Sequence, residues 1–353
     1  MGILNPVEQH NYGVRLAREH RYNEAADCFY RATEAGLIAS HKALYATLIA
    51  SSRISEAWRA ARKYLSLASH DYDFANNYFG EIFKHGLTFR PAYRQVPVGD
   101  RPFVSFVICS HRDARFATIY QEIDRVAMAY PHEIIRIADA RCMGEGYQRG
   151  FNQSHGEIVV LCHDDIEFVI PDFMARLIEV MADADMVGIA GSRRLTGPAM
   201  LFDGHPHIAG RFMQPYAENV NGSQAGNELC AYSLTTLRSS AQVLDGVFIA
   251  ARRTLFDALR FDTAIPDFHY YDVDISYRAY LSGARVVLAS DLTLLHHSKG
   301  NFDDKWSLSK EYFTKKFPSL NSEPGNARHY YVRAFFDNAM TLPLAQAFND
   351  AMG

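Results

Sequence analysis

The sequence predicts an α/β domain with a mostly parallel sheet, preceded by a small all-helical domain. Three short runs rich in β-branched residues, Phe103–Cys109, Glu133–Ala138 and Ile158–Cys162, alternate with segments of helical periodicity. This alternation is typical of a parallel sheet with helices on its faces. Residues 1–90 instead carry apolar side chains at spacings of three and four, the pattern of amphipathic helices. A chain of 353 residues is long enough for two domains, since about 150 residues per domain is usual.

The N-terminal helices resemble tetratricopeptide units, which stack because each unit cannot bury its apolar face alone. The matching positions in the unit and in a weaker copy after it are Ala25, Phe29, Ala32, Ala57, Ala61 and Tyr64. At least about three units are usually needed for independent stability. We therefore predict a tetratricopeptide-like domain over residues 1–90 that packs on the next domain. This domain either docks an acceptor or partner or serves only as a stabilising cover of the next domain. For docking, side chains expected to be exposed are available: Tyr30, Arg31 and Trp58.

Composition divides the rest of the chain. Residues 87–102 contain three prolines and no periodicity, so residues 91–102 are predicted to be a linker. Residues 103–320 are predicted to form the α/β domain, and residues 321–353 a C-terminal helical extension. Residues 197–240 show no periodicity and are predicted to be a long loop that acts as a lid.

The charge balance and the cysteines exclude several classes of protein. The chain has 36 Lys and Arg against 40 Asp and Glu, a net charge of −4, which argues against nucleic-acid binding. No apolar run approaches the roughly 20 residues of a membrane span, and no secretory signal is evident. The five cysteines are scattered and never paired, so they are predicted to be reduced and structural. We expect a cytoplasmic protein; peripheral contact with the inner face of a membrane and self-association stay open.

Polar and acidic residues follow each of the three predicted strands. Ser110-His111-Arg112-Asp113 follow the first, Asp139 the second and His163-Asp164-Asp165 the third. In sheets of this kind, ligands bind beyond the carboxyl ends of the strands. Neighbouring carboxylates repel unless a cation or hydrogen-bond donors compensate, so a divalent metal that holds a diphosphate is predicted there.

Later in the chain, a second acidic cluster and a histidine accompany this site. Asp272 and Asp274 lie two residues apart, and His296 follows a further apolar run. A histidine after a strand, in a chain that already has acidic clusters, is a credible metal ligand. Asp274 is expected to be structural, as a cap of the helix that begins near residue 275.

The glycines Gly144, Gly146 and Gly150 imitate a dinucleotide-binding fingerprint, with Asp164 twenty residues after Gly144. The spacing is one residue too long for G-x-G-x-x-G, and the binding of a ribose does not require an acidic pair at a strand end. An NAD-dependent dehydrogenase is therefore the least favoured interpretation.

Residues 103–317 resemble the family 2-like glycosyltransferases of the GT-A fold, which move a sugar from a nucleotide donor. The resemblance rests on an ordered set of motifs: FVSFVICSHRD, EIIRIADA, EGYQRGFNQSHGEIVVLCHDDIE, MVGIAGSRR, LDGVFIAARRTLF, RFDTAIPDFHYYDVDISYRAYLSG and LLHHSKG. The variant with HDD at the metal motif and FHYYDVD later forms a recognisable subgroup. Two positions depart from the commoner pattern, since His163 replaces an acid of the metal motif and Tyr271 replaces a glutamate.

The resemblance implies a role for individual residues. Asp165 and His296 match the metal ligands, for Mn²⁺ or Mg²⁺, and Asp272 matches the catalytic base. Contacts with the nucleotide sugar are implied for Ser110, Arg112, Asp139, Tyr147, His163 and Asp164. Direct metal contact by His163 is left open, with Asp164 or a water as substitute.

The implied activity is an inverting, metal-dependent glycosyl transfer from a UDP- or dTDP-sugar to a hydroxyl acceptor. The acceptor would be a glycan, a lipid-linked glycan or a protein, in the synthesis of bacterial surface polysaccharide or glycoconjugates. A catalytically inactive protein that binds sugar nucleotides or serves as a scaffold is the main alternative, in which His163 and Tyr271 mark lost activity.

Overall fold

The structure, a computed structural model, describes residues 5–86, 94–200, 203–216, 226–298, 302–320 and 332–352. Contacts divide the chain into two units, here called the helical unit and the sheet unit. The helical unit comprises Met1–Arg90, Leu234–Thr236 and Gln346–Gly353, and the sheet unit comprises Pro91–Ser233 and Leu237–Ala345. The end of the chain, predicted to be a separate extension, is therefore shared between the two units.

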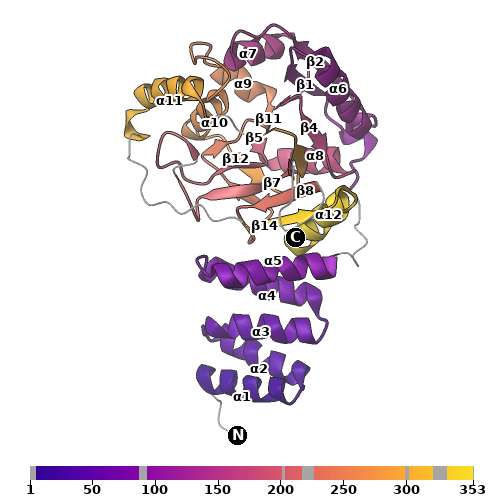
Figure 1. The fold of residues 1–353 in the computed structure, drawn as a ribbon, viewed down its shortest axis with the longest axis vertical. Helices are drawn as coiled ribbons and strands as arrows, with labels where there is room; N and C mark the ends of the chain where they lie inside the picture. The colour runs from indigo at the N-terminus through magenta and orange to yellow at the C-terminus, as the bar shows by residue number, and fades with distance from the viewer. Residues whose placement is uncertain are drawn as a thin grey trace. The chain divides into compact units, whose positions relative to one another are not determined.

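Five helices make up most of the helical unit and lie in successive layers (Figure 1): α1 (Pro6–Arg18), α2 (Tyr22–Glu34), α3 (Ala39–Ala50), α4 (Ile54–Leu67) and α5 (Tyr72–Gly86). Helix α1 begins with a capping box, in which Asn5 and Glu8 each accept a hydrogen bond from the other's backbone N–H. All six packing positions predicted from the repeat pattern are buried. The helices are confirmed, and their assignment to tetratricopeptide repeats stays a prediction.

Two of the side chains expected on the surface of the helical unit are not free there. Trp58 is only 3% exposed, and its ring packs against Tyr78 at 5.5 Å. Tyr30 is half-buried and donates a hydrogen bond to Glu56. Trp58 was wrongly placed because it stands next to Arg59 in the sequence, whereas the structure puts it on the buried face of α4.

The first sheet of the sheet unit has seven strands in the order β2-β1-β3-β11-β5-β12-β9. The strands are β1 (Val104–Cys109), β2 (His132–Ile137), β3 (Ile158–Cys162), β5 (Met186–Gly188), β9 (Arg238–Ser240), β11 (Phe248–Arg252) and β12 (Val286–Ala289). Strands β2, β1 and β3 are parallel, as predicted, whereas β11 runs antiparallel to both β3 and β5. Helices α6 (Asp113–Ala127), α7 (Met143–Gln153) and α8 (Phe173–Asp183) follow or connect these strands. The predicted α/β class is confirmed.

A second sheet has the order β10-β6-β7-β13-β4, with β8 paired to β7 and β14 paired to β8. Its strands are β4 (Ile166–Phe168), β6 (Ala190–Ser192), β7 (Ile208–Tyr216), β8 (Gly226–Ala231), β10 (Val243–Leu244), β13 (Leu294–His296) and β14 (Val332–Phe336). One prediction is therefore wrong and a second is only partly right. Residues 197–240 contain β7, β8 and β9 where a loop was expected, and residues 321–353 contain β14 as well as helix α12 (Thr341–Met352). Residues 201–202, 217–225 and 321–331 of these segments lie outside the described residues.

The glycines of α7 allow this helix to lie close to the strands. A Cβ atom at Gly146 would lie 2.6 Å from the Cys109 Sγ, and one at Gly150 would lie 2.2 Å from Val107 Cγ1 of β1. Gly144 likewise approaches the carbonyl oxygen of Asp262, 2.6 Å from where its Cβ would be. Close packing thus accounts for the spacing that imitated a dinucleotide fingerprint, without a ligand.

All five cysteines are free, in agreement with the prediction of reduced thiols. Among the described residues, no helix is both long and apolar enough to span a bilayer. Three further helices complete the sheet unit before α12: α9 (Arg253–Leu259), α10 (Tyr271–Leu281) and α11 (Asp304–Lys316).

Candidate functional site

The carboxyl ends of three strands meet at one edge of the first sheet. Val104 of β1 lies opposite His132 of β2 and Ile158 of β3, and all three strands run the same way. The residues after them therefore lie at the same edge, as the sequence predicted. Ser110 follows β1, and His163 to Asp165 follow β3.

His163, Asp165 and His296 form a cluster of three metal-ligating side chains. His296 ends β13, where it lies opposite Ile166 of β4 and so next to Asp165. The Nε2 atom of His296 is 3.3 Å from Asp165 Oδ1 and 3.3 Å from His163 Nδ1. Asp165 Oδ1 and His163 Nδ1 are 4.0 Å apart. The structure therefore brings together the predicted ligands Asp165 and His296, and adds His163 to them.

The electrostatics of the cluster suit a cation. Burial opposes ionisation of Asp165, but the hydrogen bond and charge of His296, together with His163 and Ser298, outweigh burial and hold its pKa well below the usual range. Burial and the facing His296 lower the pKa of His163, which favours a neutral imidazole. A carboxylate oxygen and imidazole nitrogens that converge within a few ångströms are ligands that divalent metals bind. The residues present fit a divalent metal.

Asp272 is the second residue of α10, and its environment makes it a poor acid and a good base near neutral pH. Its Oδ2 accepts a hydrogen bond from the backbone N–H of Gly246 at 2.8 Å. Burial, and after it the neighbouring carboxylate of Asp245, raise the pKa of Asp272 to about 7. Tyr270 enters the helix with a left-handed backbone (φ 64°), which is strained for a bulky residue, and its ring is held by Trp306 and Phe313.

The residues expected to contact the nucleotide sugar occupy different environments. The Ser110 hydroxyl donates a hydrogen bond to Asp164 at 2.7 Å, so it orients this carboxylate, which also pairs with Arg115. Arg112 is exposed at the start of α6. Asp139 is exposed and pairs with Arg149 at 2.6 Å, which lowers the pKa of its carboxyl.

Tyr147 does not lie at the surface of the site. Its side chain is fully buried, and its ring packs against Tyr271 at 5.2 Å and Phe261 at 6.0 Å. We therefore assign it no contact with a nucleotide, contrary to the sequence prediction. The reason is the helical register, which turns this position of α7 into the core beside the close-packed glycines.

Two residues of the cluster, His163 and His296, line one cleft of about 700 Å³ together with Asp272. Two parts of its lining differ in chemistry. His163, His296, Asp245 and Asp272 form a polar part, and an aromatic part follows from several elements: Phe212, Tyr232, Phe268, Tyr270, Phe302 and Trp306. Pockets of this kind, apolar with a few converging polar groups, are the usual form of small-molecule sites.

Sequence reasoning missed several residues of the cleft. Asp245 and Gly246 adjoin Asp272, and Ser298 lies 3.1 Å from His296 Nε2. Asp245 directly follows the two-residue strand β10, so an acid at a strand end was the available signal. Asp274, expected to cap α10, instead forms buried ion pairs with Arg278 and Lys316.

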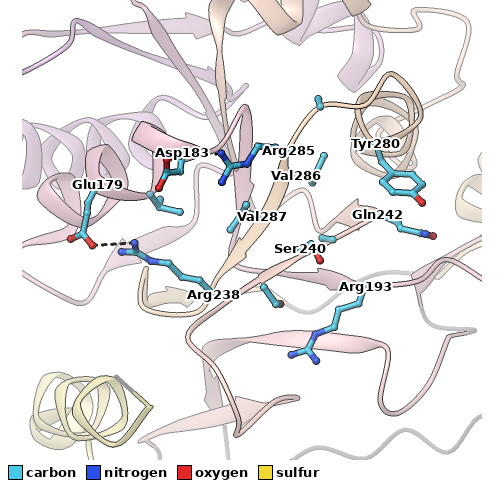
Figure 2. Close-up of a pocket in the computed structure, with 14 residues that line it drawn as sticks. Glu179, Asp183, Arg193, Arg238, Ser240, Gln242, Tyr280, Arg285, Val286 and Val287 are labelled. Carbon is cyan, nitrogen blue, oxygen red and sulfur yellow. Dashed lines mark hydrogen bonds and ion pairs between the residues drawn. The ribbon is translucent and has the colours of Figure 1, made fainter. Parts of the chain in front are cut away.

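A second cavity, of about 660 Å³, lies at the edge of the first sheet formed by β12 and β9 (Figure 2). Figure 2 shows Arg238 reaching Glu179 of α8 across this cavity, a 3.1 Å ion pair. None of the site residues predicted from the sequence lines it. Charged side chains of this second cavity pair with one another, as Arg238 does with Glu179. The cluster of possible metal ligands found among the described residues lies elsewhere, at His163, Asp165 and His296.

Comparison with known proteins identifies the family of the chain. The model of a family described as a glycosyltransferase-like family matches residues 105–317. The chain belongs to this glycosyltransferase-like family. The match spans the strand ends, the ligand cluster and Asp272. The family indicated by the sequence motifs is thus confirmed, while the HDD subgroup stays a prediction.

Solved structures of glycosyltransferases are similar to this family member at low identity. One is a mannosyltransferase from Pyrobaculum calidifontis in complex with GDP-Man and Mn²⁺, at 12% identity and a TM-score of 0.40, with 83% of this chain and 84% of that chain covered. Another is glucosyl-3-phosphoglycerate synthase from Mycobacterium tuberculosis with Mn²⁺, UDP and phosphoglyceric acid, at 14% identity and a TM-score of 0.38, with 71% and 93% covered. Among curated proteins, no match was found.

Proposed function

We propose that this chain is an inverting glycosyltransferase that moves a sugar from a nucleoside-diphosphate donor, a UDP- or dTDP-sugar, to a hydroxyl group. One observation carries the proposal: Asp272, whose pKa burial raises to about 7, lines the same cleft as His163 and His296 of the ligand cluster. A general base works best when its pKa lies near the working pH. A catalytically inactive sugar-nucleotide binder would have no need for a buried carboxylate in that state.

The chemistry follows from the positions of these residues. Asp272 accepts the proton of the acceptor hydroxyl, whose oxygen forms the new bond to the anomeric carbon. The bond between that carbon and the nucleoside diphosphate breaks on the opposite face, so the configuration inverts. A divalent cation, Mn²⁺ or Mg²⁺, at Asp165 and His296 would offset the negative charge of the leaving diphosphate. Ser110 orients Asp164, and the exposed Asp139 and Arg112 are available to the nucleoside.

The acceptor is proposed to approach Asp272 along the aromatic part of the cleft. Phe268 is 42% exposed and Phe302 is 59% exposed, although both are apolar and line the cleft. The Phe302 ring meets that of Trp306 edge-on at 5.4 Å. Aromatic faces with a few hydrogen-bonding groups between them suit the C–H faces of a sugar ring, so a glycan acceptor fits this side.

Release of UDP or dTDP from a panel of nucleotide sugars, with Mn²⁺, Mg²⁺ or EDTA, tests the proposal. We expect metal-dependent release from at least one donor, accelerated by a glycan acceptor and lost in Asp272→Asn. Tight binding of a donor with no release under any condition would instead identify an inactive sugar-nucleotide-binding protein.

A further inference from the structure

The ring of His163 is held on both sides, and the two contacts define where its protons lie. Its Nε2 atom is 3.2 Å from the hydroxyl oxygen of Tyr271, and its Nδ1 atom faces His296 at 3.3 Å. The Tyr271 hydroxyl in turn donates to the backbone carbonyl of Gly246 at 3.0 Å. These contacts join the two positions at which the sequence departs from the commoner motif pattern.

The direction of each hydrogen bond follows from the groups involved. A carbonyl oxygen only accepts, so the single phenolic proton of Tyr271 is used on Gly246. The phenol oxygen then has only lone pairs to offer His163, so His163 Nε2 carries the proton and donates it. The Nδ1 atom is therefore left with its lone pair directed towards His296 and Asp165.

Packing fixes this arrangement. Tyr271 is 4% exposed and lies in the apolar core of the sheet unit with Tyr147. Gly246 allows the approach, because a Cβ atom there would lie 2.1 Å from the Tyr271 hydroxyl oxygen. The same glycine holds Asp272 through its N–H, so one residue positions both the ring contact and the carboxylate.

We propose that His163 is a metal ligand through Nδ1 and that Tyr271 is the positioning residue that fixes its tautomer. The site is then a cluster of two histidines and one carboxylate: His163, His296 and Asp165. Two of the three distances between ligand atoms are 3.3 Å, close to the roughly 3.0–3.4 Å that adjacent ligands span at metal bonds of about 2.1 Å. Metal-binding histidines commonly donate their other N–H to a fixed acceptor in this way.

The ligand set predicts which metal binds. Mg²⁺ prefers oxygen ligands, whereas imidazole nitrogen favours first-row transition metals. Two imidazoles in place of carboxylates therefore favour Mn²⁺ or Co²⁺ over Mg²⁺. The replacement of an acid by His163 is, in this view, a change of metal preference and not a loss of activity. The inference rests on the metal site of the proposed function, and its test uses metal binding alone.

A titration of the full chain with Mn²⁺, with and without UDP, tests the proposal. Binding is measured as the loss of the electron paramagnetic resonance signal of free Mn²⁺. We expect His163→Ala to weaken Mn²⁺ binding at least tenfold. Tyr271→Phe should weaken Mn²⁺ binding about 10- to 100-fold, which is the usual effect of removing a residue that is hydrogen-bonded to a metal ligand. A 100-fold excess of Mg²⁺ should not displace Mn²⁺ from the wild type, whereas in His163→Asp it should.

A control separates the hydroxyl of Tyr271 from general damage to the fold. Tyr270→Phe removes the neighbouring buried hydroxyl, which has no hydrogen-bond partner among the described residues, and should leave Mn²⁺ affinity unchanged. Unchanged Mn²⁺ affinity in a folded His163→Ala would overturn the proposal, as would displacement of Mn²⁺ by Mg²⁺ in the wild type. Asp272→Asn should bind Mn²⁺ normally, so failure of the transfer chemistry and failure of this inference are distinguishable.

Discussion

Replacement of Asp272 by asparagine isolates the proton acceptor from the shape of the cleft. The amide oxygen can still accept the hydrogen bond from the Gly246 N–H, which is 2.8 Å long in the wild type. The amide nitrogen can face the carboxylate of Asp245. The side chain keeps its volume, but it no longer takes a proton. We therefore expect turnover to fall by about 10²–10⁴-fold, the contribution of a positioned base, with donor affinity within twofold of the wild type.

The same substitution should change stability in the opposite direction. The folded-state pKa of Asp272 is raised from 3.8 to about 7, so the carboxyl binds protons more tightly folded than unfolded. Its presence costs nothing below about pH 4 and progressively more as the pH rises to about 7. A shift of about three pKa units at about 1.4 kcal/mol each gives an upper limit of about 4 kcal/mol. At pH 8, Asp272→Asn should melt at a higher temperature than the wild type, and at pH 4 the two should coincide.

Initial rates of nucleotide release and of sugar transfer measure the first effect, and calorimetry at both pH values measures the second. Asp304→Asn, an exposed substitution in the first turn of α11, is the matched control and should change neither. A variant that retains turnover within threefold of the wild type refutes the assignment of the base. A lower melting temperature at pH 8 refutes the reasoning on its raised pKa.

Three further predictions concern the cleft. The wild-type kcat/KM should rise with pH through an apparent pKa near 7, which is an upper limit because a bound cation lowers the pKa of Asp272. Asp245→Asn removes the second cause of the raised pKa, so pH–rate profiles should show this rise at lower pH. Asp165→Ala should abolish the metal dependence of UDP binding; equal calorimetric affinity of the wild type in EDTA and Mn²⁺ contradicts this. Phe302→Ala should raise the acceptor KM about tenfold and leave donor hydrolysis unchanged, and Leu308→Ala, at a similarly exposed residue of α11, is the control. An equal rise of the acceptor KM in both variants argues against an aromatic acceptor side.

Local sequence signals were sufficient for the edge of the sheet that carries the site. Runs such as Ile158–Cys162 are short, β-branched and bounded by polar residues, so their strand identity depends little on distant partners. Parallel strands between helices then place their carboxyl ends together. This is why Ser110 and Asp165 could be placed at one edge from the sequence. Asp165 and His296, which are 131 positions apart, were instead paired through the resemblance to known glycosyltransferases, because His296 ends β13 of the second sheet.

Features that depend on distant partners were not predictable in this way. Strand β14 pairs with β8, about a hundred residues earlier, and neither has an apolar alternation strong enough to reveal a strand. Whether a side chain such as Tyr147 faces the cleft or the core depends on the orientation of α7, which close contacts between glycines and strand side chains determine. The contact between Tyr271 and His163 joins residues 108 positions apart and has no sequence signal beyond two unusual substitutions.

The helical unit is not formed by the N-terminal segment alone, which alters how its role can be tested. Gln346–Gly353 belong to it, with Phe348 only 1% exposed and packed against Phe79 at 5.7 Å. The hydroxyl of Tyr78 also donates to the carbonyl of Ala351 at 3.2 Å. Removal of residues 1–90 alone would expose this apolar end of α12 and promote aggregation whatever the function of the helices.

A fair test therefore removes residues 1–90 and 346–353 together. The family match, residues 105–317, lies entirely within the remaining chain, as do the ligand cluster and Asp272. If the helices dock the acceptor or a partner, the shortened protein should keep metal-dependent donor hydrolysis at near wild-type rates and lose transfer to the acceptor at least tenfold. Full transfer activity contradicts the docking role. Loss of both activities together with a lowered melting temperature identifies the helices as a stabilising cover, because chemistry then fails through the fold and not through the acceptor.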